Sequence, residues 1–240
     1  MTPAERLIVA LDVSSPAEAD RIVSSLGDSV HIYKVGMQLY TAEGPQIVRN
    51  LVASGKQVFL DLKYHDIPNT VAAAVREAAQ LGANMLTVHA GGGSKMLRAA
   101  VEAAHGIGSH TKILAVTVLT SMDAADLAET GVHGAVLDQV VRLGSIALEA
   151  GCQGLVSSAH EVKALREKFG DSFLAVTPGV RPAGAAHGDQ ARVVTPADAL
   201  GAGATCIVVG RPITAAPDPA RAARQILLEL ESSLPRSVRR

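Results

Sequence analysis

Residues 58 to 70 contain an expected strand, the loop after it and the start of an expected helix: Val58-Phe59-Leu60-Asp61-Leu62-Lys63-Tyr64-His65-Asp66-Ile67-Pro68-Asn69-Thr70. The first residues are apolar and predict a buried strand, and Pro68 is typical of the first turn of a helix. Because side chains on a strand alternate between its two faces, Asp61 and Lys63 are expected to point the same way. Asp66 follows just past the strand, where a loop can bring it back. Charges are costly to desolvate, so such a cluster at a strand end is a candidate for chemistry.

The same strand–helix unit recurs along the chain. Short apolar runs alternate with Ala-rich segments of helical periodicity, several of which close with glycine. Strands that are apolar on both faces suit a parallel sheet covered by helices. Eight units in 240 residues predict a single α/β domain over residues 1–240, folded as a (β/α)8 TIM barrel. Periodicity alone leaves a doubly wound open sheet as the alternative. The expected strands are Leu7–Leu11, His31–Val35, Val58–Leu62, Met85–His89, Ile113–Leu119, Gly154–Ser157, Leu174–Thr177 and Cys206–Val209. The expected helices are Pro16–Leu26, Gly44–Ser54, Pro68–Leu81, Ser94–Ala104, Leu137–Ala150, Ala159–Phe169, Pro196–Ala202 and Pro219–Leu230.

Composition argues against several classes of protein. The 22 basic and 23 acidic residues form no basic patch, and three Phe, three Tyr and no Trp are too few for a base-stacking platform. No apolar run is long enough to cross a bilayer, and no signal peptide is evident. The two cysteines lack CxxC spacing. We therefore expect a cytoplasmic protein without nucleic-acid or membrane partners, in which Cys152 and Cys206 are buried, reduced thiols.

The functional residues of a TIM barrel lie at the carboxyl ends of its strands. Five charged residues at these ends alternate in sign, which keeps each lysine protonated. A protonated lysine beside a reacting carbon can donate a proton or stabilise a developing carbanion. The alternative is a salt-bridge network that only ties strands together. The five residues are Asp12, Lys34, Asp61, Lys63 and Asp66.

Two segments late in the chain are candidates for phosphate binding. Gly210 and Arg211 follow the last strand, where barrels often hold a phosphate; glycine allows close backbone approach and arginine supplies a charged fork. The alternative is an ordinary turn with a surface arginine. The loop 181–192 is long enough to be a lid, and its Gln190 could bridge a phosphate and a ring edge; the alternative is a disordered surface loop. His89, with the glycines after it, is expected to form a strand-end turn rather than a metal or base site.

Together these motifs resemble one family. The Asp-x-Lys-x-x-Asp core alone is shared with a wider set of barrels, but the Ile-Pro-Asn-Thr extension, Lys34 and Gln190 are specific. Because of these specific motifs, the chain resembles orotidine 5'-phosphate decarboxylase of the shorter bacterial group. The resemblance covers nearly the whole chain. The matching segments are Leu11-Asp12, Tyr33-Lys34-Val35-Gly36, Asp61 to Thr70, Leu119-Thr120-Ser121, Thr177 to Pro182, Gly188-Asp189-Gln190 and Val209 to Ile213.

The resemblance implies decarboxylation of orotidine 5'-monophosphate to uridine 5'-monophosphate and CO2, the last step of de novo pyrimidine synthesis, without a cofactor or a metal ion. It implies that Lys63 donates a proton to C6 of the pyrimidine and that Asp61 lies near the departing carboxylate. It also implies a homodimer with shared active sites. The other implied roles are Asp66, Ile67 and Thr70 in the partner's site, Asp12 and Lys34 on ribose hydroxyls, Thr120 on the pyrimidine, and Arg181, Gln190, Gly210 and Arg211 on the phosphate.

Two other functions stay open. One is a relative that decarboxylates a 3-keto sugar phosphate or condenses formaldehyde with a pentulose phosphate by means of Mg²⁺. Those enzymes carry an acidic residue in place of Lys34, and a lysine there would repel a divalent cation. The other is a non-catalytic nucleotide sensor, against which the costly charged cluster argues.

Overall fold

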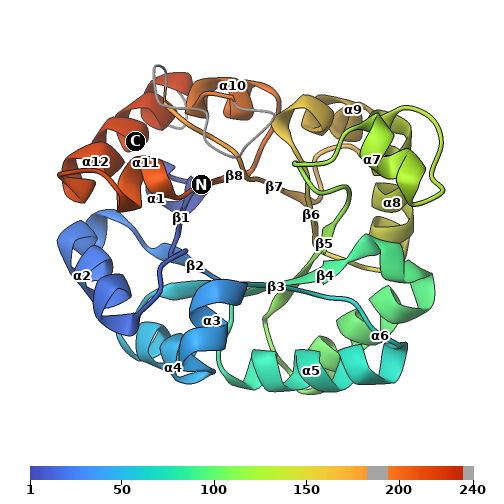
Figure 1. Ribbon diagram of the computed structural model, residues 1–240, viewed down its shortest axis with the longest axis horizontal. Coiled ribbons are helices and arrows are strands. Elements are labelled where there is room, and N and C mark those ends of the chain that lie inside the picture. The colour runs from blue at the N-terminus through green and yellow to red at the C-terminus, as the bar shows by residue number, and fades with distance from the viewer. Residues whose placement is uncertain (183–193, 235–240) are drawn as a thin grey trace.

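Eight parallel strands close into a barrel in the order in which they occur in the chain. The computed structural model describes residues 1–182 and 194–234. The first and last strands pair in register, Ile8 with Val208, so the predicted TIM barrel is confirmed and the open sheet is excluded. Figure 1 shows the helices as a ring around the strands. The strands are β1 (Leu7–Ala10), β2 (Ile32–Gly36), β3 (Gln57–Tyr64), β4 (Met85–His89), β5 (Lys112–Val116), β6 (Gly154–Val156), β7 (Leu174–Thr177) and β8 (Cys206–Val209).

The main helices follow the predicted segments, whereas four short helices were not predicted. The main ones are α2 (Pro16–Leu26), α4 (Gln46–Ala53), α5 (Pro68–Gln80), α6 (Gly93–Gly106), α8 (Val136–Glu149), α9 (Ala159–Phe169), α10 (Pro196–Gly201) and α12 (Pro219–Ser233). The unpredicted ones are α1 (Pro3–Arg6), α3 (Met37–Glu43), α7 (Ala124–Glu129) and α11 (Arg211–Thr214), and two 3-10 turns are η1 (Gly27–Ser29) and η2 (Ala90–Gly92). With four to seven residues each, the missed helices span too few turns to establish a helical period.

The apolar residues form two layers. On β1, Leu7 and Val9 pack between the barrel and the helices, while Ile8 and Ala10 fill the barrel interior. The same alternation on the other strands explains why most of them are apolar throughout: both of their faces are buried. The packed interior also forms a floor beneath the charged residues that follow the strands.

Strand β3 departs from regular pairing where it reaches the charged residues. Leu60 pairs with Leu86 on β4, but the next pair is Tyr64 with Val88, so residues 61–63 face the single residue Thr87. Within this bulge Lys63 has a φ of 51°, and it is the one non-glycine residue with a positive φ in the described part of the chain. Bulges kink a strand and re-aim its side chains, which here are those of the predicted site.

Candidate active site

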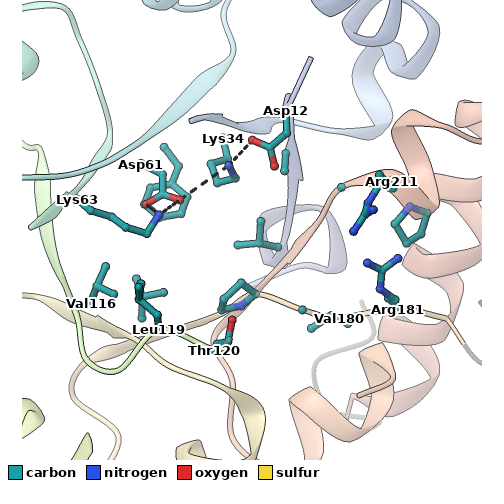
Figure 2. A pocket seen from close by; sticks show the side chains of 18 of the residues that line it. Asp12, Lys34, Asp61, Lys63, Val116, Leu119, Thr120, Val180, Arg181 and Arg211 are labelled. Carbon is teal, nitrogen blue, oxygen red and sulfur yellow. Dashed lines mark hydrogen bonds and ion pairs between the residues drawn. The ribbon is translucent and has the colours of Figure 1, made fainter. Parts of the chain in front are cut away.

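Four of the five predicted charged residues form a continuous row at the carboxyl end of the barrel (Figure 2). The Lys34 ammonium lies 2.7 Å from an Asp12 oxygen and 3.8 Å from Asp61 Oδ2. The Lys63 ammonium lies 2.9 Å from both carboxylate oxygens of Asp61. The signs therefore alternate along Asp12, Lys34, Asp61 and Lys63, as the sequence predicted.

Exposure differs along this row. All four residues line the cavity. The side chains of Lys34 and Asp61 are only 11% and 13% exposed, whereas those of Lys63 and Asp12, at the two ends, are 27% and 54% exposed. The two cations on either side of Asp61 offset the cost of desolvating its carboxylate. The row thus holds a lysine in a fixed position at the edge of open space, which is the arrangement that proton donation requires.

The cavity measures about 410 Å³, within the usual size range of small-molecule sites. Its floor consists of apolar residues that also belong to the barrel interior, among them Phe59, Val116, Val156 and Val208. Thr120 lines the cavity as predicted. In Figure 2 the charged row lies along one side and Arg181 and Arg211 lie at the other. A ligand that bridges the two sides would place an anionic group against the two arginines and its other end beside the charged row.

Arg181 and Arg211 bring two positive charges together in the cavity wall. Arg181 follows β7 and is buried, and Arg211 opens α11 after β8. Desolvation, and then the charge of Arg211, lower the pKa of the Arg181 guanidinium. An anion between the two would relieve their repulsion, and guanidinium forks match phosphate oxygens.

Two glycines contribute differently to the site. A Cβ on Gly36 would come within 2.8 Å of Lys34 Nζ and 2.9 Å of Asp12 Oδ1, so the backbone there packs against the ion pair. The sequence supplied Gly36 only as part of a motif, without this role. At Gly210 a Cβ would meet the nearest protein atom at 3.6 Å, an ordinary contact. The protein itself therefore leaves space at Gly210.

Three predicted residues lie outside the cavity within one chain. Asp66, Ile67 and Thr70 are exposed at the start of α5, and Ile67 is 67% exposed. The carboxylate of Asp66 accepts a hydrogen bond from the backbone N–H of Ile67 at 2.6 Å, and in the described structure it forms no ion pair with Lys63. Within one chain, Asp66 is therefore not part of the charged row in the described structure. Gln190 falls outside the described residues, as does most of the predicted lid.

Sequence reasoning assigned no role to Thr87. This residue is fully buried in β4; its hydroxyl donates to Asp61 Oδ1 at 2.9 Å and accepts from the backbone N–H of Lys63 at 2.8 Å. In the sequence it is one polar residue in an apolar run. The available signal was its spacing from Met85, which places both side chains on the face toward the barrel interior.

His89 forms the strand-end turn that the sequence predicted. Its Nδ1 accepts a hydrogen bond from the backbone N–H of Gly91 at 3.2 Å, which starts η2. Its ring stacks on that of His65, with centroids 5.2 Å apart. Burial, then the charges of His65 and Lys63, lower the pKa of His89. Among residues 1–182 and 194–234, no three His, Cys, Asp or Glu side chains group as metal ligands.

The two cysteines are free and buried, as predicted. Burial raises the pKa of the Cys152 thiol to about 12 and that of Cys206 to about 11. Both thiols are therefore protonated at neutral pH and poorly nucleophilic. No helix in the described part of the chain is long and apolar enough to span a membrane.

The family model, the curated relatives and a solved structure name one family. The sequence model of the orotidine 5'-phosphate decarboxylase / HUMPS family matches residues 5–226. The orotidine 5'-phosphate decarboxylase of Anaeromyxobacter dehalogenans is 54% identical over 94% of this chain and 98% of its own, and that of Halorhodospira halophila is 53% identical over 95% and 97%. The crystal structure of the Lactobacillus acidophilus orotidine 5'-phosphate decarboxylase superposes with a TM-score of 0.84 at 41% identity, covering 94% of this chain and 99% of that one. The chain belongs to the orotidine 5'-phosphate decarboxylase / HUMPS family.

Proposed function

We infer that this protein decarboxylates orotidine 5'-monophosphate to uridine 5'-monophosphate and CO2 in pyrimidine biosynthesis. The observation that carries the inference is the row Asp12–Lys34–Asp61–Lys63 across one cavity from Arg181 and Arg211. Membership of the family and about 54% identity to a bacterial orotidine 5'-phosphate decarboxylase over nearly the whole chain support it.

The two sides of the cavity suggest how the nucleotide binds. The phosphate binds between Arg181 and Arg211, with the backbone at Gly210 and the side chain of Gln190 as further contacts. Asp12 and Lys34 bind the ribose hydroxyls, and Thr120 contacts the pyrimidine. This placement leaves C6 of the ring beside Lys63 and its carboxylate beside Asp61. Binding energy from the phosphate, which is remote from the reacting carbon, would then serve to orient that carbon.

The proposed reaction uses only the row of charges. The bond between C6 and the carboxylate carbon breaks, CO2 leaves, and the electron pair stays on C6 in the plane of the ring. The Lys63 ammonium, held 2.9 Å from both oxygens of Asp61, stabilises this carbanion and then donates a proton to C6. Asp61 repels the substrate carboxylate, and the repulsion ends when neutral CO2 leaves.

Lys34 argues against the Mg²⁺-dependent alternative. Its ammonium lies 2.7 Å from Asp12 and 3.8 Å from Asp61, so a fixed cation already occupies the space between these carboxylates. A divalent ion there would meet the repulsion of Lys34 and Lys63. We therefore propose a reaction without metal or cofactor.

We further propose a homodimer in which Asp66, Ile67 and Thr70 complete the partner's site. Support comes from their exposure, from the large apolar side chain of Ile67 among them, and from the position of Lys63 at the end of its row with its side chain partly exposed. We also propose one domain over residues 1–240, because β1 and β8 pair, and a cytoplasmic location, which buried free thiols suit. Near-neutral charge fits the absence of a nucleic-acid partner.

The test is the ultraviolet absorbance of orotidine 5'-monophosphate mixed with the purified protein in chelator. We expect loss of the substrate band and formation of uridine 5'-monophosphate without added metal. No conversion by folded protein, with turnover of a sugar phosphate on addition of Mg²⁺, would overturn the proposal. Tight nucleotide binding without turnover would instead favour the sensor.

A further inference from the structure

The bulge in β3 leaves the backbone N–H of Lys63 without a hydrogen-bond acceptor on the β4 backbone. Regular pairing stops at Leu60–Leu86 and resumes at Tyr64–Val88, so the backbone N–H of Lys63 bonds to the side chain of Thr87 instead of to a strand carbonyl. A buried N–H without a partner is costly. Thr87 thus closes the gap that the bulge opens.

The same hydroxyl also fixes the carboxylate next to Lys63. A threonine hydroxyl has one hydrogen, and Thr87 donates it to Asp61 Oδ1 at 2.9 Å while accepting from Lys63 N–H at 2.8 Å. Asp61 Oδ2 lies on the side of Lys34, at 3.8 Å. The Asp61 carboxylate is therefore held from two sides. Because the Lys63 ammonium bonds to both of its oxygens, the position of the ammonium depends on that carboxylate.

We propose that Thr87 is a positioning residue for the decarboxylation: it holds the backbone of Lys63 and the carboxylate of Asp61 together so that the ammonium faces the reacting carbon. The inference rests on the proposed function. Thr87 itself is fully buried and does not line the cavity, so it acts through these two residues. Its β-branched side chain also restricts rotation of the hydroxyl about χ1.

The test compares Thr87→Val, which keeps the shape and removes the hydroxyl, with Thr87→Ser, which keeps the hydroxyl. Thr111→Val is the matched control, because Thr111 is also a buried threonine, and its hydroxyl donates to Ala83 O outside the cavity lining. Wild-type turnover is measured first, so failure of the proposed function would be seen before any variant is compared. For each variant we would measure kcat, KM, the affinity for uridine 5'-monophosphate and the melting temperature.

We expect Thr87→Val to lower kcat by about 10- to 100-fold, the scale on which small displacements of catalytic groups act, with product affinity nearly unchanged. Thr87→Ser should restore most of kcat, and Thr111→Val should keep kcat even where it lowers the melting temperature. If Thr87→Val fails to fold, Thr87→Ala takes its place. The proposal is overturned if the variant without the hydroxyl turns over like wild type, if the serine variant is equally impaired, or if kcat merely follows stability in all variants.

Discussion

Lys63 has an unfavourable backbone conformation, and its charged side chain belongs to the row of ion pairs. A non-glycine residue at a φ of 51° costs about 1–3 kcal/mol, and such a conformation persists only where its surroundings enforce it. Here the backbone N–H is bonded to Thr87 and the ammonium to Asp61. The strain is located at the residue proposed to carry the chemistry, as expected for a position selected for function rather than for stability.

Replacement of Lys63 by alanine should therefore separate catalysis from binding. We expect Lys63→Ala to lose most of kcat, because the ammonium acts mainly on the carbanion, while affinity for uridine 5'-monophosphate stays within a few-fold of wild type. Single-turnover kinetics and product titration would measure the two effects. Turnover near the wild-type rate would refute the role assigned to Lys63.

Substitution of Gly36 should change substrate binding by Asp12 and Lys34, which are proposed to bind the ribose, without much change in the stability of the fold. In Gly36→Ala the new Cβ would lie 2.8 Å from Lys34 Nζ and 2.9 Å from Asp12 Oδ1, so the ion pair has to move. Because both contacts are the ends of side chains, we expect a several-fold rise in KM with a small change in melting temperature. Gly106→Ala, where a Cβ would meet no neighbouring atom within 4 Å, is the control. Equal KM values in the two variants would contradict this account of Gly36.

At the scale of elements, local signals placed the longer helices well. α2 and α9 begin and end where predicted because Ser15 and Ser158 cap their amino ends and Gly27 and Gly170 follow them with positive φ. The short helices α1 and α7 also begin with a cap, Thr2 and Asp123, but they are too short to show a helical period. The bulge in β3 carries no local signal. The bulge depends on how β3 pairs with β4. Spacing within β4 could place Thr87 on the inner face, but its contacts with Asp61 and Lys63 follow from that tertiary pairing.

The turn from β4 into η2 should make stability depend on pH. His89 Nδ1 accepts the Gly91 N–H, and burial, followed by the charges of His65 and Lys63, lowers the pKa of His89 in the folded state. The unfolded ring, with a pKa of about 6.5, takes up a proton that the folded ring resists. The stabilisation is thus present above about pH 6.5 and is lost as pH falls toward the lower folded pKa.

We expect His89→Asn, which keeps a side-chain acceptor for the Gly91 N–H, to lose less free energy of unfolding than wild type between about pH 7 and pH 5. Urea unfolding at several pH values would measure the difference. An identical pH dependence in wild type and His89→Asn would show that this ring contributes nothing.

At the scale of the whole molecule, closure of the barrel brings distant parts of the chain to one cavity. The charged row comes from four residues between positions 12 and 63. Arg181 and Arg211 follow the last two strands, and they line the same cavity because β8 pairs with β1. Eight strand–helix units and the rule that barrel sites lie at strand carboxyl ends were enough to predict this. The position of Asp66 outside the row was not predictable in the same way, because strand periodicity does not determine where an exposed loop directs its side chains.

Mixing two inactive variants would test the shared site directly. In a heterodimer of Asp66→Asn and Lys63→Ala, one site receives both substitutions and the other receives neither. Random exchange makes half of the dimers heterodimers, so we expect about a quarter of wild-type activity to return. The control mixes Lys34→Ala with Lys63→Ala. Both lysines contact Asp61 of their own chain, so exchange cannot reunite an intact row. Recovery in the first mixture alone would place Asp66 across the interface. No recovery in the first mixture, after exchange is verified, would leave each site within a single chain. Equal recovery in both mixtures would show that the gain does not come from Asp66, and it would also count against the shared site.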